Sequence, residues 1–319
     1  MRRTLIAIMG VTASGKTAVG ELVASSLGGE IVCADARQLF RELVLGTGKP
    51  TRDELAALPH HLFDLHELGE QPTAGRWALA AAKVCESCFA RGVVPVLVGG
   101  SGLYLNALRE GLHPEPPKDA SVRTALESEC AALGVEAMHA RLRSLDPGSA
   151  DRLAPRDRQR ILRALEVVQV GGRPLAWWRE RPREAPLVAE WRAYELVCEP
   201  ARLSERIEQR TRMMWECGLL AETRTLVELG HEASLRRLAA IGYDEALDNL
   251  AGTLGAEKAE RRMNERTRQL AKRQRTWFRH QTVAEPIPLM SGVEAGVAHI
   301  LAGISIHPGK PADGGSLLA

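Results

Sequence analysis

The residues from Gly10 to Thr17 have the types and spacing of a phosphate-binding loop. The segment Gly-Val-Thr-Ala-Ser-Gly-Lys-Thr matches the pattern G-x-x-x-x-G-K-[ST] without a gap. Glycines let such a backbone wrap closely around a phosphate group, so that successive N–H groups and a helix N-terminus point at its oxygens. Lys16 would add a positive charge, and the hydroxyl of Thr17 would be a ligand for Mg²⁺. The expected phosphate-binding residues are Gly10, Val11, Thr12, Ala13, Ser14, Gly15, Lys16 and Thr17.

One acidic residue, Asp35, stands where it could take part in chemistry beside that loop. It ends the apolar run 31–35, whereas the apolar run that ends at Gly99 offers a metal ion no Asp of the Walker B kind. A buried carboxylate beside a metal-bound phosphate can act as a general base or as an outer ligand of the metal. A helix N-cap is the structural alternative for Asp35.

Three continuous apolar runs predict the strands that position these residues, at 4–9, 31–35 and 93–98. Helical patterns separate the runs, and this alternation is typical of a parallel sheet with helices on both faces. We therefore expect an α/β fold of the P-loop NTPase kind. Because ligands bind at the carboxyl ends of parallel strands, the phosphate loop, Asp35 and residues 99–101 should meet in one crevice.

The sequence divides into four predicted parts. A proline-rich break leads from the sheet-forming part into Arg-rich, helix-forming sequence. We expect residues 1–112 to form the first part of the P-loop core and residues 113–199 to form an inserted, mostly helical domain. Residues 200–302 would complete the core and carry a basic face, and residues 303–319 would be a disordered tail.

Two long helices are predicted after the insertion, over residues 201–229 and 256–280. On the first of them, Arg202, Arg206 and Arg210 recur at four-residue spacing and therefore share one face. Arg206 or Arg210 could reach a phosphate group of a ligand. The alternative is ion pairing with acidic residues of the same helix, and the spacing does not decide between the two.

Length and composition place the chain among globular proteins. It has 319 residues, of which 45% are hydrophobic and 26% charged, and these values exclude a fibrous repeat or a wholly disordered chain. The apolar stretch near the start is far too short for a membrane helix, and no cleavage-type site follows it. Six cysteines are too few for a disulfide scaffold, so we expect reduced thiols, a cytoplasmic location and no membrane partner.

Positive charge is concentrated in two segments. Residues 141–183 hold eleven Arg against five acidic residues, and residues 258–279 hold nine Lys or Arg against two Glu. Because the net charge of the whole chain is only +2, the remainder is acidic. Arginine-rich segments favour a polyanionic partner such as a nucleic acid. Solvated helix faces are the alternative, and composition alone leaves both open.

The second long helix separates its basic and apolar residues by face. Met263, Leu270 and Trp277 recur at seven-residue intervals, as expected for a stripe that packs against the core. Lys272 and Arg275 belong to a basic stripe on another face. We expect these two residues to meet the phosphate backbone of a nucleic acid.

Eight segments together carry a resemblance to one family, the tRNA dimethylallyltransferases, over about residues 4–281. Any one of them except the phosphate loop would be a weak signal, whereas eight in the family's order are very specific. The segments are Gly10–Thr17, Ala34-Asp-Ala-Arg-Gln38, Gly46-Thr-Gly-Lys-Pro50, Pro59-His-His-Leu-Phe-Asp64, Gly99-Gly-Ser-Gly-Leu-Tyr104, Asp157–Glu166, Ile241-Gly-Tyr243 and Thr267–Arg279.

The resemblance implies a reaction and its partners. Enzymes of this family transfer the dimethylallyl group of dimethylallyl diphosphate to N6 of the adenosine 3′ of the anticodon in tRNA and release diphosphate. An Asp in the position of Asp35 then accepts the proton of N6, and Thr12 assists the departure of diphosphate. Lys16 and an arginine, here Arg210, neutralise the leaving group, with Mg²⁺ held by Thr17 as the cofactor. The expected protein is a monomer that binds dimethylallyl diphosphate and the anticodon stem-loop of tRNA.

The resemblance also assigns tRNA contacts. Those expected at the target adenosine and its neighbours are Asp35, Ala36, Arg37 and Gln38. Ser101 and Arg123 fall where the family makes single contacts. Contacts with the anticodon loop are expected from Gln159, Arg160, Ile161, Leu162 and Arg163. Ala36 stands where the family has Ser, so one hydroxyl contact of the family is missing.

Three other functions compete with this prediction. A small-molecule P-loop kinase would share the loop and an Asp near the second strand, but such kinases are shorter and lack the Arg-rich insertion. An adenylate isopentenyltransferase, which prenylates free nucleotides, would need neither basic segment. An RNA-binding protein that uses the loop as a nucleotide switch would leave Asp35 without a role.

Overall fold

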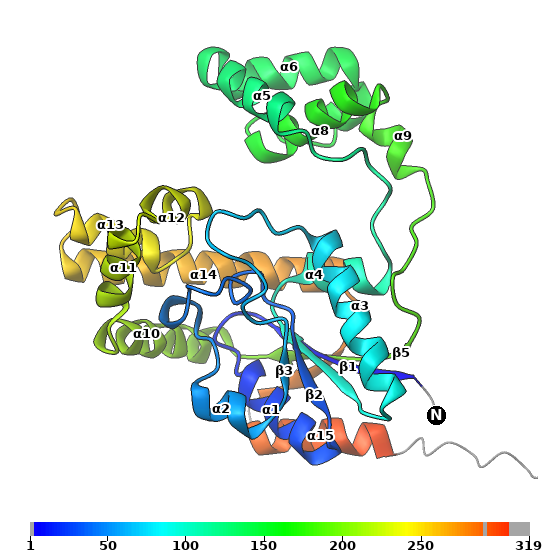
Figure 1. The fold of residues 1–319 in the computed structure, drawn as a ribbon, viewed down its shortest axis with the longest axis vertical. Helices are drawn as coiled ribbons and strands as arrows, with labels where there is room; N and C mark the ends of the chain where they lie inside the picture. The colour runs from blue at the N-terminus through cyan, green and yellow to red at the C-terminus, as the bar shows by residue number, and fades with distance from the viewer. Residues whose placement is uncertain (1–2, 290–291, 306–319) are drawn as a thin grey trace, which may run out of the picture. The chain divides into compact units, whose positions relative to one another are not determined.

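The computed structural model describes residues 3–289 and 292–305, which form two compact units. The insertion, Glu110–Ala185, is one unit. The described residues before and after it form the other, which is called the core unit below (Figure 1). No helix in the described part of the chain is long and apolar enough to cross a membrane. All six cysteines are free thiols.

The core unit is built on a six-stranded sheet in which every neighbouring pair of strands is parallel. The order across the sheet is β3-β2-β4-β1-β5-β6. The strands are β1 (Thr4–Gly10), β2 (Glu30–Cys33), β3 (His60–His61), β4 (Pro95–Gly99), β5 (Glu190–Val197) and β6 (Glu285–Pro288). The predicted α/β fold is confirmed.

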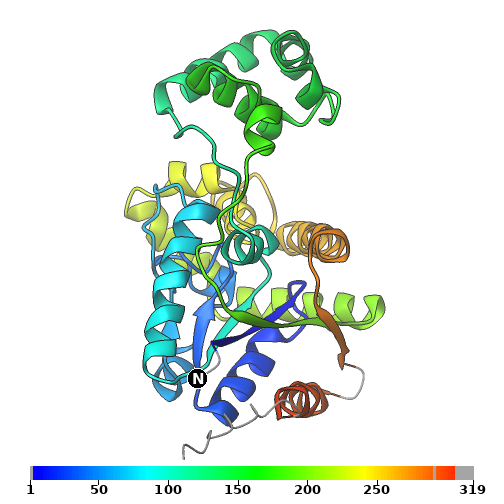
Figure 2. The same ribbon diagram turned by 90° about the vertical axis from the view of Figure 1, so that its right-hand side faces the viewer.

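Helices cover both faces of this sheet, as Figures 1 and 2 show. On one face, α1 (Lys16–Leu27) lies beside α15 (Val293–Ser305), and apolar side chains of both pack on β1, β4 and β5. On the other face, α3 (Ala74–Ala90) and α4 (Gly102–Arg109) pack together over the same strands. Because β1, β2 and β4 are buried on both sides, their sequences are continuous apolar runs.

A group of helices stands beside the carboxyl ends of the strands. It comprises α10 (Pro200–Glu216), α11 (Leu219–Glu228), α12 (Glu232–Leu238), α13 (Tyr243–Leu250) and α14 (Ala256–Gln281). The long helix α14 contacts α10, α13, α4 and β1. It agrees with the predicted helix 256–280. The predicted single helix 201–229 is wrong, because Gly218 adopts a left-handed φ of 105° and separates α10 from α11.

The insertion is helical throughout and has its own apolar core. Its helices are α5 (Ala120–Leu133), α6 (Val135–Leu145), α7 (Pro147–Ala150), α8 (Arg158–Gly171) and α9 (Leu175–Arg179). Its predicted end at residue 199 is wrong, because β5 belongs to the core sheet and pairs with β1. The tail predicted from residue 303 also begins too early, since α15 continues to Ser305. Residues 306–319 lie outside the described part of the chain.

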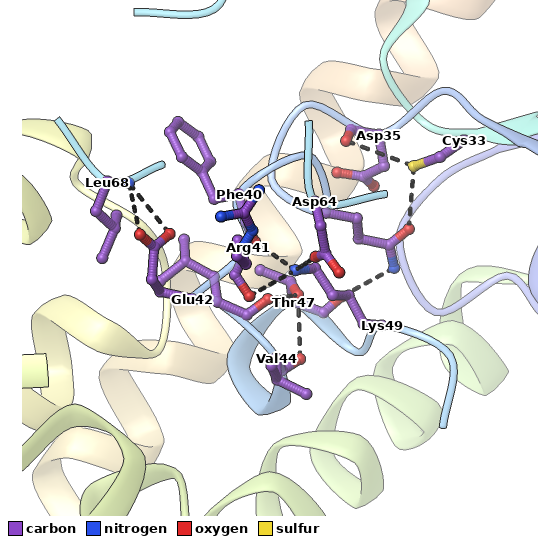
Figure 3. Close-up of polar contacts among 12 residues, drawn as sticks. Cys33, Asp35, Phe40, Arg41, Glu42, Val44, Thr47, Lys49, Asp64 and Leu68 are labelled. Carbon is purple, nitrogen blue, oxygen red and sulfur yellow. Dashed lines mark hydrogen bonds and ion pairs between the residues drawn. The ribbon is translucent and has the colours of Figure 1, made fainter. Parts of the chain in front are cut away.

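Two short elements complete the core unit between β2 and β3. They are the 3-10 turn η1 (Leu45–Thr47) and helix α2 (Arg52–Ala57). The loop that carries them also contains Lys49, whose ammonium group donates to the carbonyl oxygens of Phe40 and Arg41 and pairs with Asp64 (Figure 3). This buried ammonium fixes the loop between β2 and β3 at its centre.

Candidate active site

A cavity of about 550 Å³ opens at the carboxyl ends of β1, β2 and β4. Its lining comes from the phosphate loop, from residues 35–38 and from residues 98–101, together with side chains of α10 and α14. The crevice expected from the order of the strands is therefore present. Helices that follow the insertion in sequence supply the rest of its wall.

The phosphate loop has the conformation that its glycines allow. Gly15 is the N-cap of α1 with φ 93°, and Ala13 adopts φ 61°. The Ser14 N–H donates to the Val11 carbonyl at 3.2 Å, so the chain turns tightly there. Thr12, Lys16 and Thr17 line the cavity. The N-terminus of α1 therefore presents its free N–H groups beside a lysine and two hydroxyls, as an anion site requires.

Lys16 and Arg210 place their charged groups in this cavity without an ion-pair partner among the described residues. Burial lowers the pKa of Lys16 to about 8, although Asp35 opposes the shift. Burial also lowers the pKa of Arg210, again against the attraction of Asp35. No carboxylate of the described residues lies within ion-pair distance of either side chain. A bound anion such as a diphosphate would supply the missing negative charge.

The structure distinguishes the three arginines of α10. Arg210 lines the cavity and donates to the hydroxyl of Thr12 at 3.4 Å and to the Thr47 carbonyl at 3.1 Å. Arg206 instead donates to the Ser14 carbonyl at 3.4 Å and supports the phosphate loop from outside the cavity. Arg202 is exposed to solvent. Glu208 pairs with Arg268 of α14, so pairing along α10 is not the role of these arginines.

The segment after β2 is held in place by side chains that were expected to contact tRNA. Ala36 N–H donates to the Ser101 hydroxyl at 2.9 Å, and Arg37 N–H donates to the Asp35 carboxylate at 3.0 Å. The amide nitrogen of Gln38 donates to the carbonyls of Thr47 and Gly48, and its oxygen faces the thiol of Cys33. Residues 36–39 form turns, so Asp35 caps no helix.

Sequence reasoning missed Gln274, which joins three parts of the site. The Thr12 N–H donates to its side-chain oxygen at 2.8 Å, and its side-chain nitrogen donates to the Gly100 carbonyl at 3.0 Å. Gln274 thereby fixes α14 against the phosphate loop and the end of β4. Arg266 and Arg273, seven residues apart on α14, line the cavity and were missed as well. Their spacing was a usable signal, because it places them on one face of the helix.

The structure agrees only in part with the apolar and basic stripes predicted on α14. Met263 is buried in the core beside α13, and Trp277 packs against the core beneath α3 and α4. Leu270, however, lines the cavity, because α14 turns this face toward the ligand site. Lys272 is exposed and Arg275 is half-buried, and neither of them lines the cavity.

In the insertion, two of the residues expected at tRNA are structural. Ile161 and Leu162 are fully buried in the core of this unit, because they form the apolar face of α8. Their side chains are therefore unavailable to tRNA, so a contact of these two residues with tRNA would have to come from the backbone. Gln159 and Arg160 precede them at the start of α8 and are exposed.

The remaining two residues that were expected to contact tRNA, Arg123 and Arg163, lie near the buried carboxylate of Glu166. It lies 3.1 Å from the Arg163 guanidinium and 3.9 Å from that of Arg123. The Asp119 N–H also donates to it at 3.2 Å. Glu115 binds the outer side of Arg163 at 2.9 Å. Both arginines thus take part in an ion-pair network within the insertion.

The residues near the phosphate loop offer too few ligands to hold a divalent cation by themselves. They fit a cation that is also bound by the oxygens of a phosphate compound. Thr17 offers one hydroxyl, and Asp35 is the carboxylate of the cavity lining. Among the described residues, the one cluster of metal-ligand types is Glu30, His61 and Cys88, away from the cavity. There the guanidinium of Arg91 already binds both oxygens of Glu30, at 2.5 and 2.7 Å.

Comparison with known proteins agrees with this geometry. A family model described as IPP transferase matches residues 38–281, and one described as isopentenyl transferase matches residues 3–69. The chain belongs to the IPP transferase family. The first match alone spans more than half of the sequence, and the cavity residues lie within the two matched segments.

Individual relatives cover nearly the whole chain. A tRNA dimethylallyltransferase of Halorhodospira halophila is 41% identical over 286 residues, which are 88% of this chain and 92% of that protein. The tRNA dimethylallyltransferase of Anaeromyxobacter dehalogenans is 43% identical over 282 residues, 87% and 90% of the two chains. The crystal structure of a full-length tRNA isopentenylpyrophosphate transferase from Bacillus halodurans is 31% identical. The structural match covers 95% of this chain and 96% of the Bacillus halodurans chain, with a TM-score of 0.67.

Proposed function

We propose that this IPP transferase family member is a tRNA dimethylallyltransferase, which transfers a dimethylallyl group to N6 of the adenosine 3′ of the anticodon. One observation carries the proposal: the intact phosphate loop and Asp35 open on a single cavity in which Lys16 and Arg210 lack acidic partners. Relatives that share about two fifths of the sequence and nearly its full length are prenyltransferases of tRNA by name, which supports the same activity here.

Dimethylallyl diphosphate fits the two chemical halves of the cavity. The diphosphate would lie in the phosphate loop, where Lys16 and Arg210 neutralise it and Thr12 contacts its bridging oxygen. The five-carbon chain needs an apolar wall, and the lining includes Ile207, Met214, Ile241, Met263 and Leu270. Water would capture an allylic cation, so an apolar wall also protects the reacting carbon.

Asp35 is the group that completes the reaction. In the transfer step, the bond from C1 of the donor to the diphosphate oxygen breaks. Diphosphate departs and keeps the electron pair of that bond. A bond from C1 to N6 of adenine forms, and the proton that N6 loses passes to the Asp35 carboxylate. The N6 lone pair is delocalised into the ring, so removal of this proton assists a weak nucleophile.

Mg²⁺ is the cofactor that we propose, with Thr17 as its protein ligand. When bound, it would neutralise negative charge on the departing diphosphate. The cavity offers few ligands besides Thr17 and Asp35, so the metal would be held mainly by the diphosphate and water. Lys16 and Arg210 perform the same neutralisation from the protein side.

The acceptor that we propose is the anticodon stem-loop, bound by a monomer. The target adenosine must leave its stack to reach the cavity, and the turn at residues 36–38 would meet it there. Exposed basic residues on α14 and in the insertion would bind the RNA backbone. A small-molecule kinase or an enzyme of free nucleotides has no use for these basic residues.

The test is a comparison of acceptors. The purified protein is incubated with labelled dimethylallyl diphosphate, Mg²⁺ and one of unmodified tRNA, AMP or ATP, and label in each acceptor is measured. We expect label in tRNA alone, on the adenosine 3′ of the anticodon. Label in AMP or ATP, or consumption of ATP without the prenyl donor, would support the rival enzymes instead.

A further inference from the structure

Residues 44–48 connect the reacting groups to helices outside the cavity. This segment includes η1 and overlaps the motif Gly46-Thr-Gly-Lys-Pro50, which the mechanism above leaves without a role. The motif Ile241-Gly-Tyr243 is likewise unassigned, although Ile241 lines the cavity. The structure joins these two motifs by a direct hydrogen bond from the Gly46 N–H to the phenol oxygen of Tyr243 and by further bonds through Glu222.

Glu222 of α11 and Tyr243 of α13 bind the outer side of the segment. The Glu222 carboxylate accepts from the Val44 N–H at 3.1 Å and from the Leu45 N–H at 3.0 Å. It also accepts from the phenol of Tyr243. The phenol oxygen in turn accepts from the Gly46 N–H at 3.2 Å. Three consecutive backbone amides are therefore held by two side chains.

Tyr243 is suited to this task by its environment. Its side chain is fully buried, and burial together with the Glu222 carboxylate raises the pKa of its phenol well above the ordinary value. The phenol therefore stays protonated at any physiological pH and remains a donor to Glu222. Because the phenol is buried and its hydrogen bonds to half-buried Glu222 and to Gly46 are satisfied, this contact fixes a geometry more strictly than a fully exposed one.

The inner side of the same segment binds the reacting cluster. The Thr47 carbonyl accepts from Arg210 at 3.1 Å and from the amide of Gln38 at 3.2 Å, and the Gly48 carbonyl accepts from Gln38 at 2.8 Å. Figure 3 shows Thr47 between Val44 on one side and the residues that follow β2 on the other. Arg210 thus has one hydrogen bond to the segment and one to Thr12.

Two glycines leave the segment no room to shift. A Cβ atom at Gly46 would lie 2.4 Å from the ring of Tyr243, and one at Gly48 would lie 2.3 Å from the guanidinium of Arg210. Gly48 also adopts φ 60°, which disfavours other residues. The backbone therefore touches Tyr243 on one side and Arg210 on the other, so a displacement on one side is transmitted to the other.

We propose that Glu222 and Tyr243 are positioning residues that hold Arg210 in place for the diphosphate through residues 44–48. They touch neither donor nor acceptor. Their effect is on the position of a guanidinium that must meet the leaving group as its charge develops. This inference rests on the proposed function, because it needs a diphosphate at Arg210.

The test is a double-mutant cycle between Tyr243→Phe and Arg210→Ala. Tyr243→Phe keeps the buried ring and removes the hydrogen bonds to Glu222 and Gly46, and we expect kcat to fall by about tenfold to a hundredfold. The dissociation constant for tRNA should not change. In the Arg210→Ala background, Tyr243→Phe should cause no further loss, because the group it positions is gone. Glu222→Gln should behave in the same way.

The control is Tyr194→Phe, which removes a phenol from a buried tyrosine of β5 outside the cavity lining and should leave kcat unchanged. Multiplicative losses in the double variant, or a normal kcat in both Tyr243→Phe and Glu222→Gln, would overturn the inference. If Tyr243→Phe fails to fold, the cycle with Glu222→Gln decides in its place. A wild-type protein that prenylates no tRNA would instead reject the proposed function itself.

Discussion

Lys16 and Arg210 in the cavity and the arginines of the insertion have partners of opposite kinds. Lys16 and Arg210 donate to neutral oxygens, namely the carbonyls of Val11 and Thr47 and the hydroxyl of Thr12. In the insertion, a series of arginines binds carboxylates of the same unit. They are Arg123, Arg141, Arg143, Arg156, Arg160, Arg163 and Arg183.

The cavity therefore contains cations that are free to bind an anionic ligand, whereas these arginines of the insertion are engaged in ion pairs within their own unit. A neutral oxygen orients a cation without cancelling its charge, so Lys16 and Arg210 keep their attraction for a diphosphate. A carboxylate partner offsets part of that attraction. It stabilises the insertion where the pair is buried, as at Arg163 and Glu166, and contributes little where both side chains are exposed, as at Arg156 and Glu136. The Arg-rich composition of the insertion therefore overstates the charge that is free to meet tRNA.

The largest effect should come from Asp35→Asn, which keeps the shape of the side chain and removes the base. We expect the rate of prenyl transfer to fall by about a hundredfold or more, because removal of a general base costs that much. The dissociation constant for tRNA should stay within about twofold, as measured by filter binding. A near-normal rate would assign the proton to another acceptor.

The second prediction concerns Lys16→Met. Loss of a charge-assisted contact of roughly 2 to 3 kcal/mol should weaken binding of dimethylallyl diphosphate by about thirtyfold or more, as measured by calorimetry. In the wild-type protein the same affinity should fall as the pH rises above about 8, because the pKa of Lys16 is lowered to about 8. A donor affinity that is independent of pH between 7 and about 9 would contradict this role.

Lys16→Met should also stabilise the protein at neutral pH. The pKa of Lys16 is lower in the folded chain than its ordinary value of 10.5, so the unfolded chain binds more protons between about pH 8 and that value. The free energy of unfolding of the wild-type protein therefore rises with pH across this window. Below the window, the protonated Lys16 lowers this free energy by its full amount, because the charged ammonium group is buried. The melting temperature of Lys16→Met at pH 7 should exceed that of the wild type, and a lower value would contradict the burial of this charge.

The third prediction tests the opposite behaviour in the insertion. Arg163→Ala removes the guanidinium that lies nearest to the buried negative charge of Glu166. The free energy of unfolding of the insertion should therefore fall by roughly 1 to 3 kcal/mol. Hydrogen exchange of α5 and α8 should become faster, while donor binding in the core unit stays normal. Unchanged exchange together with weakened tRNA binding would show that Arg163 serves the RNA directly.

The smallest effect is expected from Lys272→Ala. Lys272 is exposed on α14 and has no carboxylate partner among the residues that the structure describes. If it neutralises one phosphate, the slope of log affinity for tRNA against log salt should fall by about 0.7 to 0.9. Arg261→Ala is the matched control, since Arg261 is exposed on the same helix and lies 3.8 Å from Glu257. Equal slopes in all three proteins would make Lys272 a solvated side chain.

The parts of the fold that the sequence predicts are those buried on both sides. The strands β1, β2 and β4 stand out as apolar runs, and the loop after β1 has its own motif. Strand β5 escapes prediction because Glu190, Arg192 and Glu195 interrupt its apolar residues. The predicted insertion therefore runs to residue 199, across a strand of the core sheet.

The site was predictable where a residue type alone implies chemistry. Lys16, Thr17 and Asp35 were found in this way, and all three line the cavity. Gln274 has no such signal, because its role depends on two backbone atoms that only the folded chain brings to its amide. For Ile161 and Leu162 the family motif gave no information about side-chain direction, and the structure buries both side chains in the core of the insertion.

The most direct test of the account is the structure of a complex with an unmodified anticodon stem-loop and an unreactive thiodiphosphate analogue of the donor. We predict the diphosphate within the loop Gly10–Thr17, in contact with Lys16 and Arg210. The Asp35 carboxylate should lie about 3 Å from N6 of the adenosine 3′ of the anticodon. A complex in which the analogue occupies another site, or in which N6 faces away from Asp35, would contradict the account.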